Sequence, residues 1–195
     1  MKSDSIEQKI LEFITAVGKL KNLPRTGWRE KAAINAPESV AEHMYRTAVI
    51  SMILGDLERL DTEKILKMAL IDDLPEAMIG DLTPTQKKTL GLTSVKCQEE
   101  KAIRQLLSLL PKTLSKEYLA IWKEAQSQRS REAKLVKSVD KLEMAIQAQE
   151  YKNQIHEPKS LDEFIKSAEK SMRVEIVKKI FRILKEKPKI FYGQS

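Results

Sequence analysis

Apolar side chains recur every three or four residues along most of this chain of 195 residues, which is the period of an amphipathic α-helix. Residues 5–22 show the pattern most simply, because Ile6, Ile10 and Val17 share one face and Ser5 stands at an N-cap position. Six glycines and 5% aromatic residues fit the same interpretation, since strands favour aromatic and β-branched side chains. The sequence therefore predicts an all-α protein, built as a single-domain helical bundle.

Further helices are predicted from the same period and from local start and stop signals. Ser39 and Glu42 form the S-x-x-E pattern of a capping box, which marks a helix start. Two stretches that contain Pro and Gly, residues 23–39 and 81–92, are predicted to be loops. The predicted helices cover residues 39–56, 62–72, 94–111, 114–127, 129–153 and 160–186, with a short helical piece that ends at Ile79.

Composition excludes several classes of protein. Cys97 is the only cysteine, which excludes a disulfide framework within the chain and a zinc-finger spacing. No apolar run approaches the roughly 20 residues that span a membrane, and the first ten residues lack the apolar core of a signal peptide. No linker divides the chain, so we expect one domain over residues 1–186 and a short tail over 187–195. The expected location is the cytoplasm, without a membrane partner.

The charge of the chain is unevenly distributed. Residues 1–97 hold 14 basic and 14 acidic side chains, whereas residues 98–195 hold 21 and 14, so the second half carries the whole net charge of +7. A basic half is one feature of proteins that bind nucleic acid. No aromatic residues alternate with these basic ones, however, and solvated helix faces explain the excess more simply. The sequence therefore disfavours nucleic acid as a partner.

Asp72, Asp73, Glu76 and Asp81 lie within ten residues of one another, interleaved with apolar side chains. The apolar residues indicate that the segment packs inward, where unpaired carboxylates are costly and a bound cation would offset the cost. Asp72 and Glu76 share a helix face if the helix continues. A structural explanation stands beside this one, with Asp73 as an N-cap, Pro75 in the first turn and Glu76 completing a capping box. The spacing alone does not decide between the two.

His43 and Asp140 are further candidates for chemistry. His43 lies on a largely apolar predicted helix, where a lone histidine is more often a hydrogen-bonded core residue than a ligand. Asp140 lies at the edge of an apolar stripe, where pairing with Lys137 or Lys141 would explain it. The second histidine, His156, is interpreted as a surface residue.

Four motifs, taken together, resemble one family. In chain order they are Arg25-Thr-Gly-Trp28, Pro37-Glu-Ser-Val-Ala-Glu-His43, Ala69-Leu-Ile-Asp-Asp-Leu-Pro-Glu76 with Gly80-Asp81, and Val136-Lys-Ser-Val-Asp140-Lys-Leu-Glu. Their order and spacing are similar to those of the HD-domain phosphohydrolases, and most similar to the 5'-deoxynucleotidase branch. The resemblance runs from about Leu20 to Tyr151 and implies the all-α HD-domain fold.

The resemblance implies one divalent metal ion, which the family holds with an H…HD…D set of ligands. On this sequence the first His is His43, the Asp of the pair is Asp73 and the last Asp is Asp140. Asp72 stands where the family has its second His. If Asp72 reaches the metal, one imidazole and three carboxylates favour Mn, Co or Mg over Zn. If it falls short, the alternative is a catalytically weakened module that binds nucleotides or regulates a partner.

The resemblance also implies the reaction, which is removal of the 5'-phosphate from deoxyribonucleoside monophosphates. Glu76 matches the family residue that serves the hydrolytic water, and Asp81 matches the one that serves the leaving group. Arg25 and Trp28 match residues near the substrate, where Arg suits the phosphate and Trp suits the base or sugar. For both, a role in anchoring the loop is the alternative. The usual self-association of the family implies a homodimer.

Overall fold

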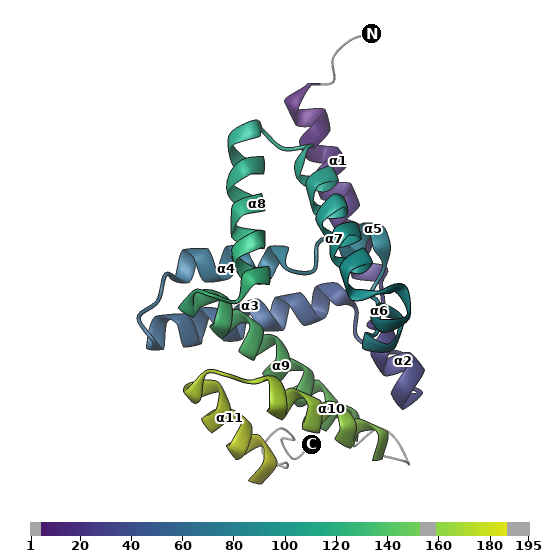
Figure 1. Ribbon diagram of the computed structural model, residues 1–195, viewed down its shortest axis with the longest axis vertical. Coiled ribbons are helices and arrows are strands. Elements are labelled where there is room, and N and C mark those ends of the chain that lie inside the picture. The colour runs from purple at the N-terminus through teal and green to yellow at the C-terminus, as the bar shows by residue number, and fades with distance from the viewer. Residues whose placement is uncertain (1–4, 153–158, 187–195) are drawn as a thin grey trace, which may run out of the picture.

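The computed structural model describes residues 5–152 and 159–186, and within these ranges the chain is mostly helical (Figure 1). This confirms the predicted all-α class. The predicted tail, residues 187–195, and His156 lie outside the described residues. No described helix is long and apolar enough to cross a membrane. The elements are α1 (Ile6–Gly18), the 3-10 turn η1 (Lys19–Asn22), α2 (Thr26–Ala32), α3 (Val40–Leu57), α4 (Thr62–Ile71), α5 (Glu76–Ile79), α6 (Pro84–Leu90), α7 (Leu92–Leu107), α8 (Lys112–Ser127), α9 (Arg131–Lys152), α10 (Lys159–Ser171) and α11 (Glu175–Glu186).

The predicted capping residues start their helices as expected. At the start of α1 the Gln8 N–H donates to Ser5 Oγ over 3.3 Å. At the start of α3 the Ser39 N–H donates to Glu42 Oε2 over 2.6 Å, and the Glu42 N–H donates to Ser39 Oγ over 3.2 Å. These bonds satisfy N–H groups that no carbonyl of the helix can reach. The capping box therefore fixes the start of the helix that carries His43.

The first predicted loop, residues 23–39, contains helix α2. Its ends are joined by backbone hydrogen bonds, from the Arg25 N–H to the Glu38 carbonyl over 2.9 Å and from the Val40 N–H to the Leu23 carbonyl over 2.8 Å. The stretch between these bonds has room for a helix of seven residues. So short a helix displays too few apolar positions for its period to be recognised in the sequence.

The second predicted loop, residues 81–92, contains helix α6. Thr83 and Gln86 form a capping box, and Pro84 occupies the first turn. The Pro and Gly content predicts a loop here, but proline is compatible with the first helical position because its missing N–H has no partner there. Pro84 therefore marks the start of α6 and not a loop.

The predicted helix over residues 160–186 is in fact two helices, α10 and α11. Between them the Arg173 N–H donates to Ser138 Oγ of α9 over 3.1 Å. The break allows Val177 and Phe181 of α11 to be buried in the core cluster that α9 dominates. Neither Gly nor Pro marks the break, so the sequence pattern runs through it without interruption.

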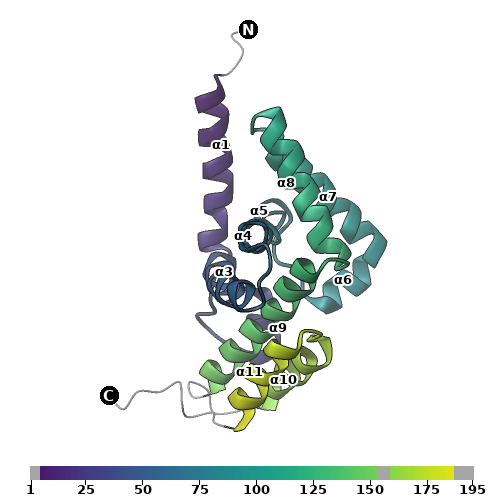
Figure 2. The same cartoon turned by 90° about the vertical axis from the view of Figure 1, so that its left-hand side faces the viewer.

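Helix α9 is central to the fold. It contacts α3, α4, α8, α10 and α11, and its Leu135, Val139 and Leu142 are at most 1% exposed. Figure 1 shows α3 and α4 side by side above α9, with α10 and α11 below it. In Figure 2, α1 stands on one side of the molecule, and α7 and α8 stand on the other. This packing brings Asp140 and Glu143 of α9 against α3.

Candidate metal centre

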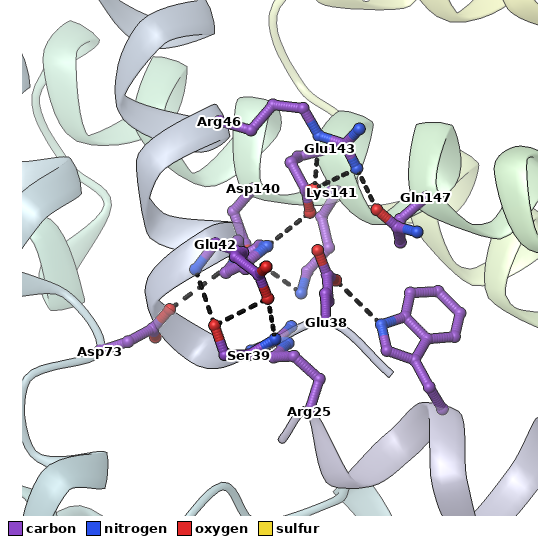
Figure 3. A network of polar contacts seen from close by, with 12 residues as sticks. Arg25, Glu38, Ser39, Glu42, Arg46, Asp73, Asp140, Lys141, Glu143 and Gln147 are labelled. Carbon is purple, nitrogen blue, oxygen red and sulfur yellow. Dashed lines mark hydrogen bonds and ion pairs between the residues drawn. The ribbon is translucent and has the colours of Figure 1, made fainter. Parts of the chain in front are cut away.

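His43 of α3 lies where two other segments meet it. Its side chain is 1% exposed, and its Nε2 lies 3.1 Å from Asp140 Oδ1 of α9 and 3.6 Å from Asp73 Oδ2 in the turn after α4. Figure 3 shows Asp73 and Asp140 approaching from different helical segments. Three residues far apart in the sequence, each predicted as a ligand, are therefore brought together at one nitrogen atom.

The other nitrogen of His43 is held by a residue that the sequence analysis missed. Nδ1 lies 2.5 Å from Oε2 of Glu143, whose side chain is fully buried. The other carboxylate oxygen of Glu143 accepts from Arg46 Nε over 2.9 Å and from Arg46 Nη2 over 2.7 Å (Figure 3). A carboxylate on Nδ1 fixes the orientation of the ring and directs the second nitrogen toward a ligand. The available signal was the spacing of Asp140 and Glu143, three residues apart on one helix face.

The acidic groups around His43 also determine its charge. Burial and the nearby Arg25 lower the pKa of His43, but the hydrogen bonds to Asp140 and Glu143 outweigh them and raise it to about 10. These surroundings favour the protonated, positively charged imidazole. A metal cation bound at Nε2 would provide positive charge at the same place and would displace the proton from that nitrogen. One imidazole nitrogen with converging carboxylate oxygens therefore fits a divalent metal ion.

A second acidic group lies on the Nδ1 side of the same ring. Single ligand atoms of Glu38, His43 and Glu143 lie within 4.8 Å of one another. Glu38 already accepts a hydrogen bond of 2.9 Å from Trp28 Nε1, and Glu143 is held by Arg46. Burial and the charge of Glu143 raise the pKa of Glu38 to about 7. Trp28 thus engages Glu38, and His43 and Arg46 engage Glu143, whereas Asp73 and Asp140 converge on the Nε2 side of the ring.

Asp72, the fourth predicted ligand, makes its contacts away from His43. Its Oδ1 accepts from Gln126 Nε2 over 2.6 Å, and its Oδ2 lies 3.8 Å from Lys137 Nζ. Within the described ranges no ion pair joins Asp72 to His43. Burial, with the charges of Asp73 and Asp140, raises the pKa of Asp72 to about 6 against the opposing effect of Lys137. The Asp72 carboxylate therefore faces Gln126 and Lys137, and it lines the same cavity as Asp73.

The alternative role of Asp73 as a helix cap is not the one it has. Helix α5 begins after Pro75, and no side-chain hydrogen bond caps it. Glu76, which would complete a capping box, instead has a buried Oε2 without a hydrogen-bond partner. Burial and the charges of Asp73 and Asp81 raise the pKa of Glu76 to about 9. Of the two explanations for this acidic segment, the geometry favours the one in which its carboxylates face a cation.

Asp81 connects the acidic segment to the start of α2 through contacts with Arg25 and Thr26. Its Oδ2 accepts a hydrogen bond of 2.7 Å from the Thr26 N–H, and its Oδ1 lies 4.0 Å from Arg25 Nη1. Burial works against the charge of Arg25, yet Asp73, Asp81 and Glu76 together raise the pKa of Arg25 above its usual value. Arg25 therefore faces the same carboxylates that surround the metal position.

Trp28 does not have the role predicted from the resemblance. Its side chain is 2% exposed, and its ring contacts Tyr151 and Phe164 with centroid distances of 5.3 and 4.3 Å. Its Nε1 donates to Glu38. No face of the ring is left for a base or sugar, so in this structure Trp28 anchors the loop, as the alternative interpretation held.

A cavity of about 210 Å³ opens beside the acidic segment. Its lining includes Asp73, Glu76, Lys87 and Lys137. Lys87 Nζ also pairs with Glu99 over 2.8 Å. The cavity gives a small anionic ligand a path to the carboxylates and to two lysines.

Comparisons with known proteins agree with this arrangement. The sequence profile of the HD domain matches residues 17–181. The human protein 5'-deoxynucleotidase HDDC2 is 38% identical over 181 residues, which cover 92% of this chain and 87% of that protein. The protein of the same name from Dictyostelium discoideum is 43% identical over 155 residues, covering 75% and 80% of the two chains. The crystal structure of the PH0347 protein from Pyrococcus horikoshii OT3 superimposes with a TM-score of 0.74 at 35% identity, covering 90% of this chain and 96% of that one.

Proposed function

The chain belongs to the HD domain family, and from this premise we propose that it is a metal-dependent phosphohydrolase that removes the 5'-phosphate of deoxyribonucleoside monophosphates. The relatives named 5'-deoxynucleotidase support the substrate class. The observation that carries the proposal is the convergence of Asp73 and Asp140 on Nε2 of His43. A histidine with a buried carboxylate on its other nitrogen is prepared for a ligand at this position.

We propose that His43, Asp73 and Asp140 hold one divalent cation. Carboxylate-rich sites favour hard cations, so Mn, Co or Mg is expected in preference to Zn. When bound, such a cation neutralises charge on the phosphate and makes water a stronger nucleophile near neutral pH.

The remaining residues of the site have complementary roles in the proposed reaction. Within the described residues Oε2 of Glu76 has no hydrogen-bond partner, and burial with the charges of Asp73 and Asp81 raises the pKa of Glu76. A cation held beside these carboxylates would lower that pKa, so that Glu76 would accept the proton of the attacking water. The water oxygen would form the new bond to phosphorus as the bond from phosphorus to the 5'-oxygen breaks. Asp81, which pairs with Arg25, would pass the proton taken up by Glu76 to the 5'-oxygen. The planar fork of Arg25, which faces these carboxylates, binds two phosphate oxygens.

A homodimer remains part of the proposal. Large apolar side chains stay exposed along two helices, Leu11 (63%) and Ile14 (58%) on α1, and Tyr45 (71%), Ile53 (49%) and Leu57 (64%) on α3. Figure 2 shows α1 and α3 on the same side of the molecule. We propose that a second copy of the chain covers this face. A molar mass of two chains in solution supports this, and the mass of one chain for the wild type contradicts it.

We also propose a cytoplasmic location. Cys97 is exposed and free, which is suited to a reducing compartment, and nucleotides are the expected substrates. Cell fractionation with an antibody to the chain tests this.

Release of inorganic phosphate from a panel of deoxyribonucleoside monophosphates tests the proposed function directly. The metal-stripped protein should be inactive and should regain activity with Mn, Co or Mg. Release with none of these metals or nucleotides would contradict the proposal. Nucleotide binding without release would instead support the alternative of a binding module.

A further inference from the structure

Asp72 is fixed in place by helix α8. Trp122 Nε1 donates to the backbone carbonyl of Asp72 over 3.3 Å, and Gln126 Nε2 donates to its Oδ1 over 2.6 Å. The side chain is only 12% exposed. Two contacts from one helix, one to the backbone and one to the carboxylate, therefore determine where the second oxygen of Asp72 points.

That second oxygen points toward a lysine of α9. Lys137 Nζ lies 3.8 Å from Asp72 Oδ2 and 3.3 Å from Asp140 Oδ2. Asp140 presents its other oxygen, Oδ1, to His43. One ammonium group is thus shared between Asp72, which within the described ranges makes no ion pair with His43, and Asp140, which does.

The net charge of the proposed ligand set explains why the contact between Lys137 and Asp72 matters. A set of two imidazoles with Asp73 and Asp140 carries a charge of −2, which matches a divalent cation. Asp72 in place of an imidazole makes the charge −3. Among the described residues, Lys137 is the cation within ion-pair distance of Asp72, and its single positive charge returns the sum to −2.

We propose that Lys137 is the charge partner of Asp72 and a positioning residue of this site, whose ammonium group offsets the charges of Asp72 and Asp140 and weakens divalent metal binding. The inference rests on the proposed metal site but not on the nucleotide substrate. Removal of the ammonium group takes a positive charge away from Asp140 and leaves the charge of Asp72 without its partner. If residue 72 is His, only the first of these effects remains.

The test is a double-mutant cycle on the affinity for Mn²⁺, measured by isothermal titration calorimetry on metal-stripped full-length protein. Lys137→Met should tighten Mn²⁺ binding at least tenfold in the wild-type background. In the Asp72→His background the same substitution should change the affinity less than threefold. Lys137→Arg keeps the charge and should keep the wild-type affinity.

Lys141→Met is the matched control. Lys141 Nζ lies 3.0 Å from Asp140 Oδ2, as Lys137 does at 3.3 Å, but among the described residues it makes no ion pair with Asp72, and its charge lowers the pKa of Asp72 less than the charge of Lys137 does. The factor by which its removal changes the Mn²⁺ affinity should therefore differ less between Asp and His at position 72 than the factor for Lys137→Met does. Thermal unfolding of each variant without metal verifies that the fold is retained.

Each outcome of the calorimetry either supports or overturns the inference about Lys137. Binding that appears only in Lys137→Met, or tightens there more than in the double variant, supports the inference. Equal factors in both backgrounds, or weaker binding in Lys137→Met, overturn it while the metal site stands. Absence of Mn²⁺ binding in every folded variant overturns both the metal site and the inference. Phosphate release, measured separately, reports on the proposed substrate and not on this inference.

Discussion

Nδ1 of His43 and Oε2 of Glu143 lie 2.5 Å apart at the contact between α3 and α9. This contact orients the imidazole, because Glu143 is itself held by two nitrogens of Arg46. The ring cannot turn without breaking a buried, charge-assisted hydrogen bond. The face of His43 that we propose binds the metal is therefore set by Glu143, a residue outside the proposed ligands.

Glu143→Gln should weaken Mn²⁺ binding about tenfold, because an amide orients the imidazole less strongly than a carboxylate and makes it less basic. Calorimetry on the metal-stripped variant measures this. Glu150→Gln is the control, since Glu150 also contacts Arg46, at 2.8 Å, but has no ion pair with His43. Equal affinities for wild type and Glu143→Gln would contradict the orienting role.

Glu38 should make the stability of the metal-free protein depend on pH. Its pKa rises from 4.5 to about 7 on folding, mainly because it is buried, so its ionisation favours the unfolded chain. Stability from this group is complete below about pH 4.5 and is lost as the pH rises through about 7, by up to about 3 kcal/mol. Glu38→Gln stays neutral and should flatten this part of the profile, as urea unfolding at several pH values would measure. An unchanged profile would show that Glu38 is not buried as described.

Trp28→Phe should destabilise the protein by about 1–2 kcal/mol, because it removes the hydrogen bond to Glu38 and part of the buried ring. The KM for a deoxyribonucleoside monophosphate should change less than threefold, since the ring is buried. Urea unfolding and steady-state kinetics measure the two effects. A tenfold rise in KM without loss of stability would restore the substrate-binding interpretation.

Arg25→Met should raise the KM for the same substrates by about tenfold to a hundredfold, which is the range expected for loss of a charged hydrogen bond to phosphate. Arg29→Met, an exposed position on the neighbouring α2, is the control and should leave KM unchanged. The same KM for wild type and Arg25→Met would remove Arg25 from the phosphate site.

The helical class and the main caps could be predicted from the sequence because they depend on local patterns. The capping box of Ser39 and Glu42 is an example, since its partners are three residues apart. The break before α11 could not be predicted, because its cause is a hydrogen bond from Arg173 to Ser138 in another helix.

The site, too, combines residues that a sequence pattern indicates with residues whose roles depend on contacts between distant elements. His43, Asp73 and Asp140 were candidates because a family pattern resembles this sequence, and not because their own surroundings in the chain required it. Glu143 ends the last of the quoted motifs, but the sequence gives it no role, because its importance depends on how α9 packs against α3. The direction of Trp28 likewise follows from contacts with Tyr151 and Phe164, more than 120 residues away.

The central claim is that a divalent metal at Nε2 of His43 supports hydrolysis. The most direct measurement compares Mn²⁺ binding and Mn²⁺-dependent phosphate release for wild type and Asp73→Asn after metal removal. We predict that wild type binds Mn²⁺ and releases phosphate only when Mn²⁺ is present, and that Asp73→Asn loses at least tenfold in both. Phosphate release that needs no metal, or full binding and activity in Asp73→Asn, would contradict the account.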